Sequence, residues 1–242
     1  MNQKNRLLKL TVLSMLIALG VIISPILRFE GMCPMAHFIN ITCAVFLGPW
    51  YSLACAAIIG ILRMTLMGIP PLALTGAVFG AFLSGVFYRL SNGKIIFAVL
   101  GEIIGTGFIG AVVSYPVMTF IWGKEGLTWS FYIPSFICGT LIGGSIAFVF
   151  LKKLASSGLL NRFQKMLASK SYEDKNDPVG NAVSIAAFGV ISYLVIKILT
   201  GIFNADSPVW TYISFSALGA FLLAAIIYLI VKKTKKDEKI EQ

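Results

Sequence analysis

Eight long apolar stretches decide what this chain can fold into. Short polar or basic segments separate them, and they cover residues 7–27, 36–48, 50–67, 72–90, 95–122, 131–151, 182–203 and 210–231. A helix needs roughly 17 to 25 apolar residues to cross about 30 Å of hydrocarbon. Only the second stretch is short for this, so we expect it to be tilted or to start in a re-entrant segment. With 57% hydrophobic residues and a mean hydropathy of +0.87, we predict an all-α, polytopic membrane helical bundle.

The first apolar stretch follows Lys4, Arg6 and Lys9, an arrangement that is also found at the start of secretory signal peptides. No A-x-A cleavage pattern directly follows the stretch, and the apolar run is longer than the hydrophobic region of a signal peptide. We therefore expect an uncleaved first transmembrane helix.

Basic residues gather in alternate loops. If the N-terminus is cytoplasmic, that side receives three Lys or Arg before the first helix, two between the fourth and fifth, six after the sixth and five in the tail. These are sixteen of the twenty in the chain. Because cytoplasmic loops carry an excess of Lys and Arg, we predict a multi-pass protein of the cell membrane with both termini in the cytoplasm. The remaining four are Arg28, Arg63, Lys124 and Lys197.

The net charge of +10 raises the question of a nucleic-acid partner. Its carriers stand in short loops and a tail beside apolar helices, without aromatic residues interleaved at the spacing of RNA-binding surfaces. Membrane topology and attraction to anionic lipid explain the charge better. We expect the lipid bilayer, and no nucleic acid, as a partner.

The composition changes once along the chain, at a polar segment that begins near residue 156. Clusters of Ser, Asn, Asp and Pro mark loops and linkers. We predict a six-helix domain over residues 1–165, a cytoplasmic polar linker over 166–181, and a two-helix membrane extension with a basic tail over 182–242. No sequence repeat relates the two halves, which argues against an inverted-repeat transporter design.

One carboxylate stands well inside an apolar stretch. It is Glu102, in the run 101–107 (GEIIGTG). A charge near the membrane centre costs about 2.5 kcal/mol or more, so such a residue usually faces the bundle interior and marks a function. Thr106 lies four residues further on and shares the same helical face. We predict that both contribute to a substrate site. The structural alternative is that Glu102 is a neutral partner in a hydrogen bond between helices.

Three further polar residues are predicted to join this site. His37 and Asn40 are three apart, so they share a face near the outer end of the second helix, and Arg63 lies near the outer end of the third. We predict a pocket open to the exterior. The alternatives are a structural histidine, an amide that links helices, and an arginine that extends to the headgroups. At 1.5 Å per residue, Arg63 and Glu102 differ by about 10 Å in depth, so a direct pair requires tilt or a helix break.

Small residues recur at intervals of four within the helices. Such spacing lets helix backbones approach closely in lipid, where the hydrophobic drive for association is absent. We expect most of these residues to pack inside the bundle, and we single out the pair on the first helix. The sets are Ser14 and Ala18; Gly76, Gly80 and Ser84; Gly101 and Gly105; Gly139 and Gly143.

Motifs for several chemistries are missing from the sequence. It has no G-x-x-x-x-G-K-[ST] loop for nucleotide binding, and its one histidine cannot furnish an H-E-x-x-H zinc site. No paired base and nucleophile stands out, and the spacing of Cys33 and His37 lacks further metal ligands. We expect no catalytic residue, no metal, no cofactor and no enzymatic activity.

Four segments, in this order, resemble the ThiW family: residues 34–40 (PMAHFIN), 46–51 (FLGPWY), 60–63 (GILR) and 101–107. The resemblance covers roughly residues 5–165. It implies a six-helix membrane protein that is the thiazole-specific substrate-binding (S) component of an energy-coupling factor (ECF) transporter. Such a component docks on a transmembrane coupling protein and two ATPases. The cargo that the resemblance implies is hydroxyethylthiazole, a building block of thiamine.

This resemblance agrees with the missing nucleotide-binding loop, because the ATPases are separate subunits. We therefore expect that Ser14 and Ala18 form the surface that docks on the coupling module. Two alternatives are an S component for a different small heterocyclic vitamin and a membrane scaffold or sensor without transport. The resemblance does not extend to the last ~75 residues, and the sequence assigns no function to their two helices.

Overall fold

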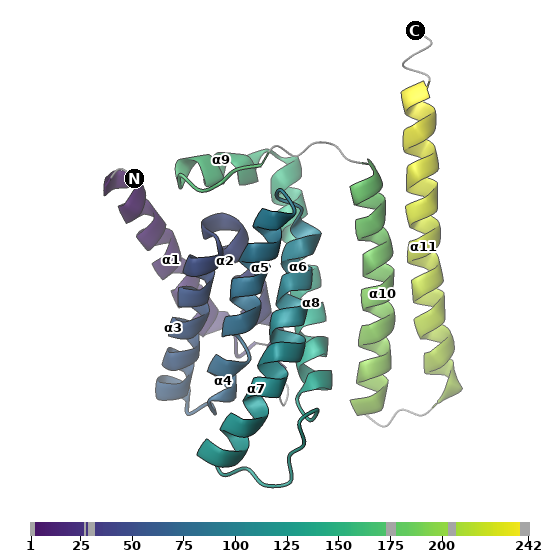
Figure 1. Cartoon of the computed structure of the whole chain (residues 1–242). Coiled ribbons are helices and arrows are strands. Elements are labelled where there is room, and N and C mark those ends of the chain that lie inside the picture. The colour runs from purple at the N-terminus through teal and green to yellow at the C-terminus, as the bar shows by residue number, and fades with distance from the viewer. Residues whose placement is uncertain (1–2, 27, 29–31, 173–177, 203–206, 238–242) are drawn as a thin grey trace. The chain divides into compact units, whose positions relative to one another are not determined.

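The computed structural model describes residues 3–26, 28, 32–172, 178–202 and 207–237, and this part of the chain forms helices and no strand (Figure 1). The predicted all-α class is confirmed. The elements are α1 (Gln3–Ile23), α2 (Pro34–Leu47), α3 (Pro49–Met67), α4 (Leu72–Thr75), α5 (Val78–Leu90), α6 (Ile95–Glu102), η1 (Ile103–Gly110), α7 (Ala111–Pro116), η2 (Val117–Ile121), α8 (Ile133–Ser156), α9 (Leu159–Met166), α10 (Pro178–Ile202) and α11 (Pro208–Asp237).

Seven helical runs among the described residues are long and apolar enough to cross a membrane. They coincide with seven of the predicted stretches, and the remaining stretch forms the shorter apolar helix α2. The predicted polytopic membrane bundle is therefore confirmed. The runs are Gln3–Ile23, Pro49–Met67, Leu72–Leu90, Ile95–Ile121, Ile133–Ser156, Asn181–Ile198 and Pro208–Lys232.

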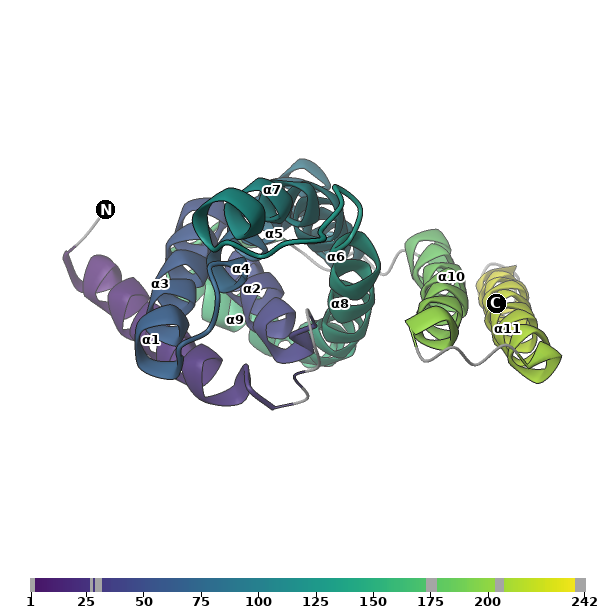
Figure 2. The same ribbon diagram turned by 90° about the horizontal axis from the view of Figure 1, so that it is seen from below.

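The chain divides into two compact units, Met1–Glu173 and Asp174–Gln242. In the first unit α2 is the central helix, packed against α1, α3, α5, α6, α8 and α9 (Figure 2). Eleven of its fourteen residues are buried, which explains why so short a helix is stable here. Part of the predicted linker, residues 173–177, lies outside the described residues.

Gly48 separates α2 from α3 and lets the chain reverse. Its φ of +94° lies in a region that glycine enters readily and other residues do not. Pro49 follows at the first position of α3, where a missing N–H costs no helical hydrogen bond. Gly68, with φ of +61°, ends α3, and its N–H donates to the carbonyl oxygen of Arg63. These two turns place α3 beside α2 and bring the chain back through α4.

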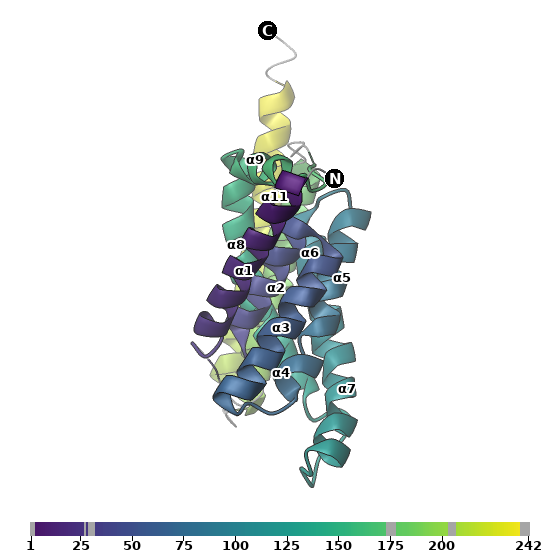
Figure 3. The ribbon, with the colours of Figure 1, turned by 90° about the vertical axis from the view of Figure 1, so that its left-hand side faces the viewer.

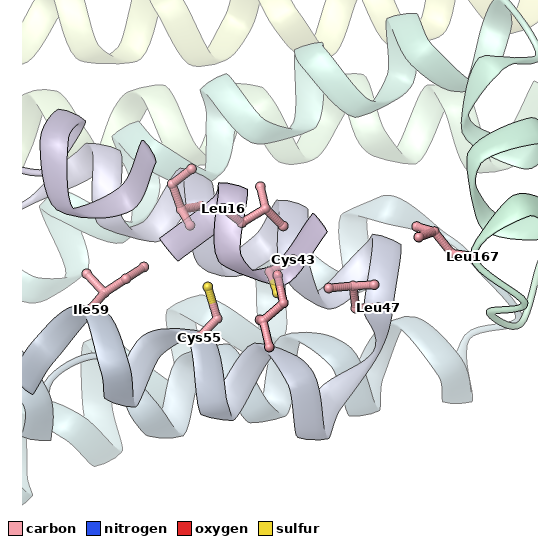
Figure 4. Packing of buried hydrophobic residues seen from close by; sticks show 8 residues of the cluster. Leu16, Cys43, Leu47, Cys55, Ile59 and Leu167 are labelled. Atoms are coloured by element: carbon pink, nitrogen blue, oxygen red, sulfur yellow. The ribbon is translucent and has the colours of Figure 1, made fainter. Parts of the chain in front are cut away.

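A buried apolar cluster joins α1, α2 and α3 (Figure 4). Leu13 and Leu16 of α1 meet Cys43 of α2 and Cys55 of α3, and both thiols are free and fully buried. Close packing of this kind supplies the dispersion contacts that hold membrane helices together. The face of α1 that carries Leu13 and Leu16 is thus fixed to the bundle.

The short helix α9 lies across the end of the first unit at which α1 begins (Figure 3). Its Gln164 is 1% exposed, and its amide donates to the carbonyl oxygen of Val45 at 2.9 Å and to the hydroxyl oxygen of Tyr88 at 3.0 Å. Leu167, directly after α9, belongs to the buried cluster of α1, α2 and α3. The helix is therefore anchored to the ends of α2 and α5.

The second unit is a hairpin of α10 and α11. Lys197 donates to Thr211 Oγ1 at 3.0 Å near one end of the hairpin, and Asn181 donates to the Tyr228 hydroxyl at 3.2 Å near the other. Between them Gly189 packs directly on Phe221. Polar contacts near both ends thus fix the register of the two helices.

Candidate functional site

Glu102 ends α6 in the first third of the span that runs from residue 95 to residue 121, and it is fully buried. Its Oε1 atom lies 2.9 Å from His37 Nδ1, 3.0 Å from Asn40 Nδ2 and 3.2 Å from Thr106 Oγ1. The amide and the hydroxyl donate to Oε1, and an N–H at Nδ1 makes the imidazole a third donor. Side chains from α2 and from η1 therefore converge on one carboxylate oxygen. None of the four residues is more than 6% exposed.

The other carboxylate oxygen, Glu102 Oε2, is buried and has no hydrogen-bond partner among the described residues. An unpaired buried acceptor costs roughly 1 to 3 kcal/mol. Gly80 of α5 lies against it, since a β-carbon there would stand 2.9 Å from Oε2 and would collide with Thr106 Oγ1. The missing side chain at Gly80 gives the carboxylate its room. Oε2 is an acceptor that can receive an N–H or O–H group.

Two glycines of α8 pack directly against the side chain of His37. A β-carbon at Gly143 would stand 2.9 Å from His37 Cβ, and one at Gly139 would stand 3.3 Å from His37 Nε2. Asn40 is fixed at its backbone, because Ser52 Oγ of α3 donates to its carbonyl oxygen at 2.9 Å. Close packing by α8 and α3 therefore sets the directions of both donors toward Glu102.

A π-helical segment, η1, follows Glu102 directly and changes the register of its helix. Gly101 packs on the backbone of Ser84, Gly105 on Gly80, and Gly110 on the carbonyl oxygens of residues 75 and 76. These glycines are four and then five residues apart, and an α-helix does not place positions five apart on one face. The wider π turn absorbs the additional residue and keeps a smooth glycine face against α5 and the end of α4.

Arg63 is placed differently from the other predicted site residues. It is 4% exposed in α3, and among the described residues no hydrogen bond or ion pair links its side chain to the Glu102 cluster. In the described part of the chain its Nε has no partner, although a buried polar nitrogen is costly when unpaired. In contrast to the predicted open pocket, all five residues are buried.

Ser14 and Ala18 lie exposed on α1, opposite the face that packs on the bundle. The Ser14 hydroxyl donates to the carbonyl oxygen of Leu10 at 2.9 Å, within its own helix. Large apolar side chains flank the pair, among them Met15, which is 60% exposed, and Ile22, which is 67% exposed. The result is a narrow, smooth strip on an apolar surface.

Sequence reasoning did not place Gly80, Gly139 or Gly143 in the site. It expected them to be packing residues, and they do pack, but against the side chains of Glu102, Thr106 and His37. Their four-residue spacing was the only signal in the sequence, and it does not say which partner each glycine faces.

Apolar helices that enclose a buried carboxylate and its polar neighbours are typical of membrane proteins that bind a small polar solute. Comparison with known families specifies the class further. Residues 10–157 match the family model ThiW, described as thiamine-precursor transporter protein. The chain belongs to the ThiW family, as its motifs predicted. All five predicted site residues fall inside the match, and the second unit falls outside. Neither the curated proteins nor the solved structures gave a match.

Proposed function

We propose that the chain is the substrate-binding S component of an energy-coupling factor transporter and that it takes up hydroxyethylthiazole. The observation that carries the proposal is the buried Glu102 cluster in a chain of a thiamine-precursor transporter family, with an Oε2 atom that none of the described residues satisfies. A buried acceptor that no residue satisfies gains a hydrogen bond when a ligand supplies the donor.

The chemistry of the ligand fits these groups. Hydroxyethylthiazole carries a hydroxyl that donates and accepts and a ring nitrogen that only accepts. In the proposal the ligand hydroxyl donates to Glu102 Oε2, while a donor from His37, Asn40 or Arg63 reaches the ring nitrogen. Thr106 already donates to Glu102 Oε1, so its role is to orient the carboxylate. Because all these groups are buried, the ligand enters by parting the helices beside Gly80.

The chain's part in transport is capture and delivery of the ligand, and energy comes from partners. The coupling module, made of a transmembrane coupling protein and ATPase subunits, docks on the α1 strip that carries Ser14 and Ala18. A smooth strip lets a partner helix approach closely. The excess of Lys and Arg in alternate loops of the sequence supports the assignment of both termini to the cytoplasm. In this division of labour the chain needs neither a cofactor nor catalytic residues of its own.

Calorimetry on the purified full chain tests the ligand assignment. The wild-type protein is expected to bind hydroxyethylthiazole saturably without ATP, and Glu102→Gln is expected to bind it about 10- to 100-fold more weakly. The glutamine oxygen can still accept the hydrogen bonds at Oε1, so the bundle stays folded. Its NH₂ group then replaces the acceptor Oε2 with a donor, which cannot receive the ligand hydroxyl.

Glu125→Gln is the matched control, because it removes the same charge from an exposed position in the loop before α8. It is expected to bind like the wild type. Equal affinity of Glu102→Gln and wild type would make Glu102 a structural residue. If only another heterocycle binds saturably, the chain is an S component for that ligand. If thiazole, thiamine and pyrimidine all fail to bind saturably, the result favours a scaffold or sensor.

A further inference from the structure

The hydrogen-bond donors around Glu102 are nearly all in use. Asn40 Nδ2 donates to Glu102 Oε1 at 3.0 Å and, more weakly, to the carbonyl oxygen of Ala77 at 3.5 Å. The Thr106 hydroxyl donates to the same Oε1 at 3.2 Å, and an N–H at His37 Nδ1 does so at 2.9 Å. The one nitrogen of these side chains that the described residues leave without a hydrogen bond is His37 Nε2.

No side chain of α8 covers His37 Nε2, because a glycine stands there. A β-carbon at Gly139 would lie 3.3 Å from Nε2. The backbone nitrogen of Cys33 lies at the same glycine, but the Cys33 thiol donates to the carbonyl oxygen of Ser24 at 2.9 Å. The His37 side chain keeps 8% of its surface accessible, whereas the side chain of Glu102 keeps none. Within this pair, Nε2 and the Oε2 atom that no described residue satisfies remain for a ligand.

Glu102 is the one titratable or charged group that the described residues bring to the His37 imidazole through a hydrogen bond or ion pair. The elements packed against α2 carry other such groups, and none of these contacts the imidazole in that way. They are Lys4, Arg6 and Lys9 on α1; Tyr51, Cys55 and Arg63 on α3; Tyr88 and Arg89 on α5; Cys138, Lys152 and Lys153 on α8; and Arg162 and Lys165 on α9. The charge of the imidazole therefore depends first on the carboxylate beside it.

The surroundings of this pair suit an imidazolium and a carboxylate. Three donors that converge on Glu102 Oε1 stabilise negative charge on the carboxylate. A lone anion inside an apolar span is costly, and a cation beside it lowers that cost. A proton on His37 gives the pair no net charge and turns Nε2 from an acceptor into a donor. The pair then presents one donor, Nε2–H, and one acceptor, Oε2.

We propose, on the basis of the proposed function, that His37 binds the ligand as an imidazolium. Its Nε2–H donates to the ring nitrogen of the thiazole, and Glu102 Oε2 accepts the hydrogen bond of the ligand hydroxyl. The site then selects a neutral heterocycle that has a hydroxyl and an unsubstituted ring nitrogen. A thiazolium, whose ring nitrogen is alkylated, has no lone pair to accept the bond and meets a cation of its own sign.

Nitrogen-15 NMR of the full-length wild-type chain tests the charge of the imidazole directly. The chain contains one histidine, so protein that is labelled at histidine and purified without a histidine tag gives imidazole signals of His37 alone. With saturating hydroxyethylthiazole at pH 7, both ring nitrogens are expected to carry a proton. A ligand-bound spectrum with one proton-free ring nitrogen would overturn the imidazolium, while the saturable binding itself would still support the proposed function.

Calorimetry with two ligands tests the specificity that follows from this charge. Hydroxyethylthiazole is compared with its N-methylthiazolium derivative, and the wild type is expected to bind the neutral ligand about 10- to 100-fold more tightly. In His37→Gln the cation is gone, although the amide can still donate to a ring nitrogen. The preference for the neutral ligand is therefore expected to shrink about tenfold.

The same preference in the wild type and in His37→Gln would contradict the role of the imidazolium. If Arg63→Gln narrows the preference and His37→Gln does not, Arg63 is the donor and the assignment to His37 is wrong. If neither ligand binds saturably to the wild type, the proposed function fails and the imidazolium site fails with it.

Discussion

Replacement of Gly105 by Ala is expected to lower the free energy of unfolding of the first unit by about 3 kcal/mol or more, and to abolish ligand binding with it. The added β-carbon would stand 2.5 Å from Gly80 Cα and 2.5 Å from the carbonyl oxygen of Phe79. Both contacts are backbone atoms, which cannot rotate away as a side chain does. Helix α5 must therefore move off η1, and Gly80 moves away from Glu102 with it.

Gly107→Ala is the matched control, two residues further along η1. Its β-carbon would meet the side-chain Cγ1 of Ile137 at 2.9 Å and the backbone of that residue only at 3.5 Å. A side chain can adjust, so Gly107→Ala should lower the free energy of unfolding clearly less than Gly105→Ala does. Reaction of a thiol dye with the buried Cys43, Cys55 and Cys138 during heating reports the unfolding of each variant. Equal melting temperatures of the two variants would contradict the tight contact of α5 and η1.

Ala18→Trp is expected to leave hydroxyethylthiazole binding intact and to reduce uptake to background, a loss of at least about tenfold. Ala18 is exposed on α1, so an indole there disturbs no contact within the unit. It does fill the smooth strip on which the coupling module is proposed to dock. Binding is measured in detergent, and uptake is measured in cells that express the coupling module.

Val149→Trp serves as the control on a different surface. Val149 of α8 is 61% exposed, so the same bulk is added at a position away from the α1 strip. It should transport like the wild type. Normal uptake by Ala18→Trp would exclude this strip as the docking surface, and a simultaneous loss of binding would mean that the strip packs within the protein.

The spans and their class were predictable because hydropathy and length act locally along the chain. The glycine spacing likewise predicted close helix packing, and Gly80, Gly105 and Gly143 do pack closely. Contacts between residues that are far apart in the sequence were not predictable in the same way. His37 and Glu102 are 65 residues apart, and only the fold shows that His37, Asn40 and Thr106 meet at one oxygen.

The π-helical register after Glu102 shows a second limit. A proline inside a helix marks a local distortion, and the π segment η2 does follow Pro116 directly, but the other π segment, η1, begins well before it. The register of η1 fits Gly105 to Gly80 of α5 and Gly110 to Thr75 and Gly76 at the end of α4, and no periodicity within one helix reveals such contacts between helices. Arg63 marks the same limit, since its burial was not evident from its place near a helix end.

The most direct test of the proposed function is uptake of labelled hydroxyethylthiazole by cells that lack their own thiazole uptake. The chain is expressed alone, with the coupling protein and active ATPases, and with ATPases that cannot hydrolyse ATP. Accumulation only with the active module is the predicted result. Equal accumulation by the chain alone, or no accumulation with the active module while ligand binding is intact, would contradict the assignment as an S component.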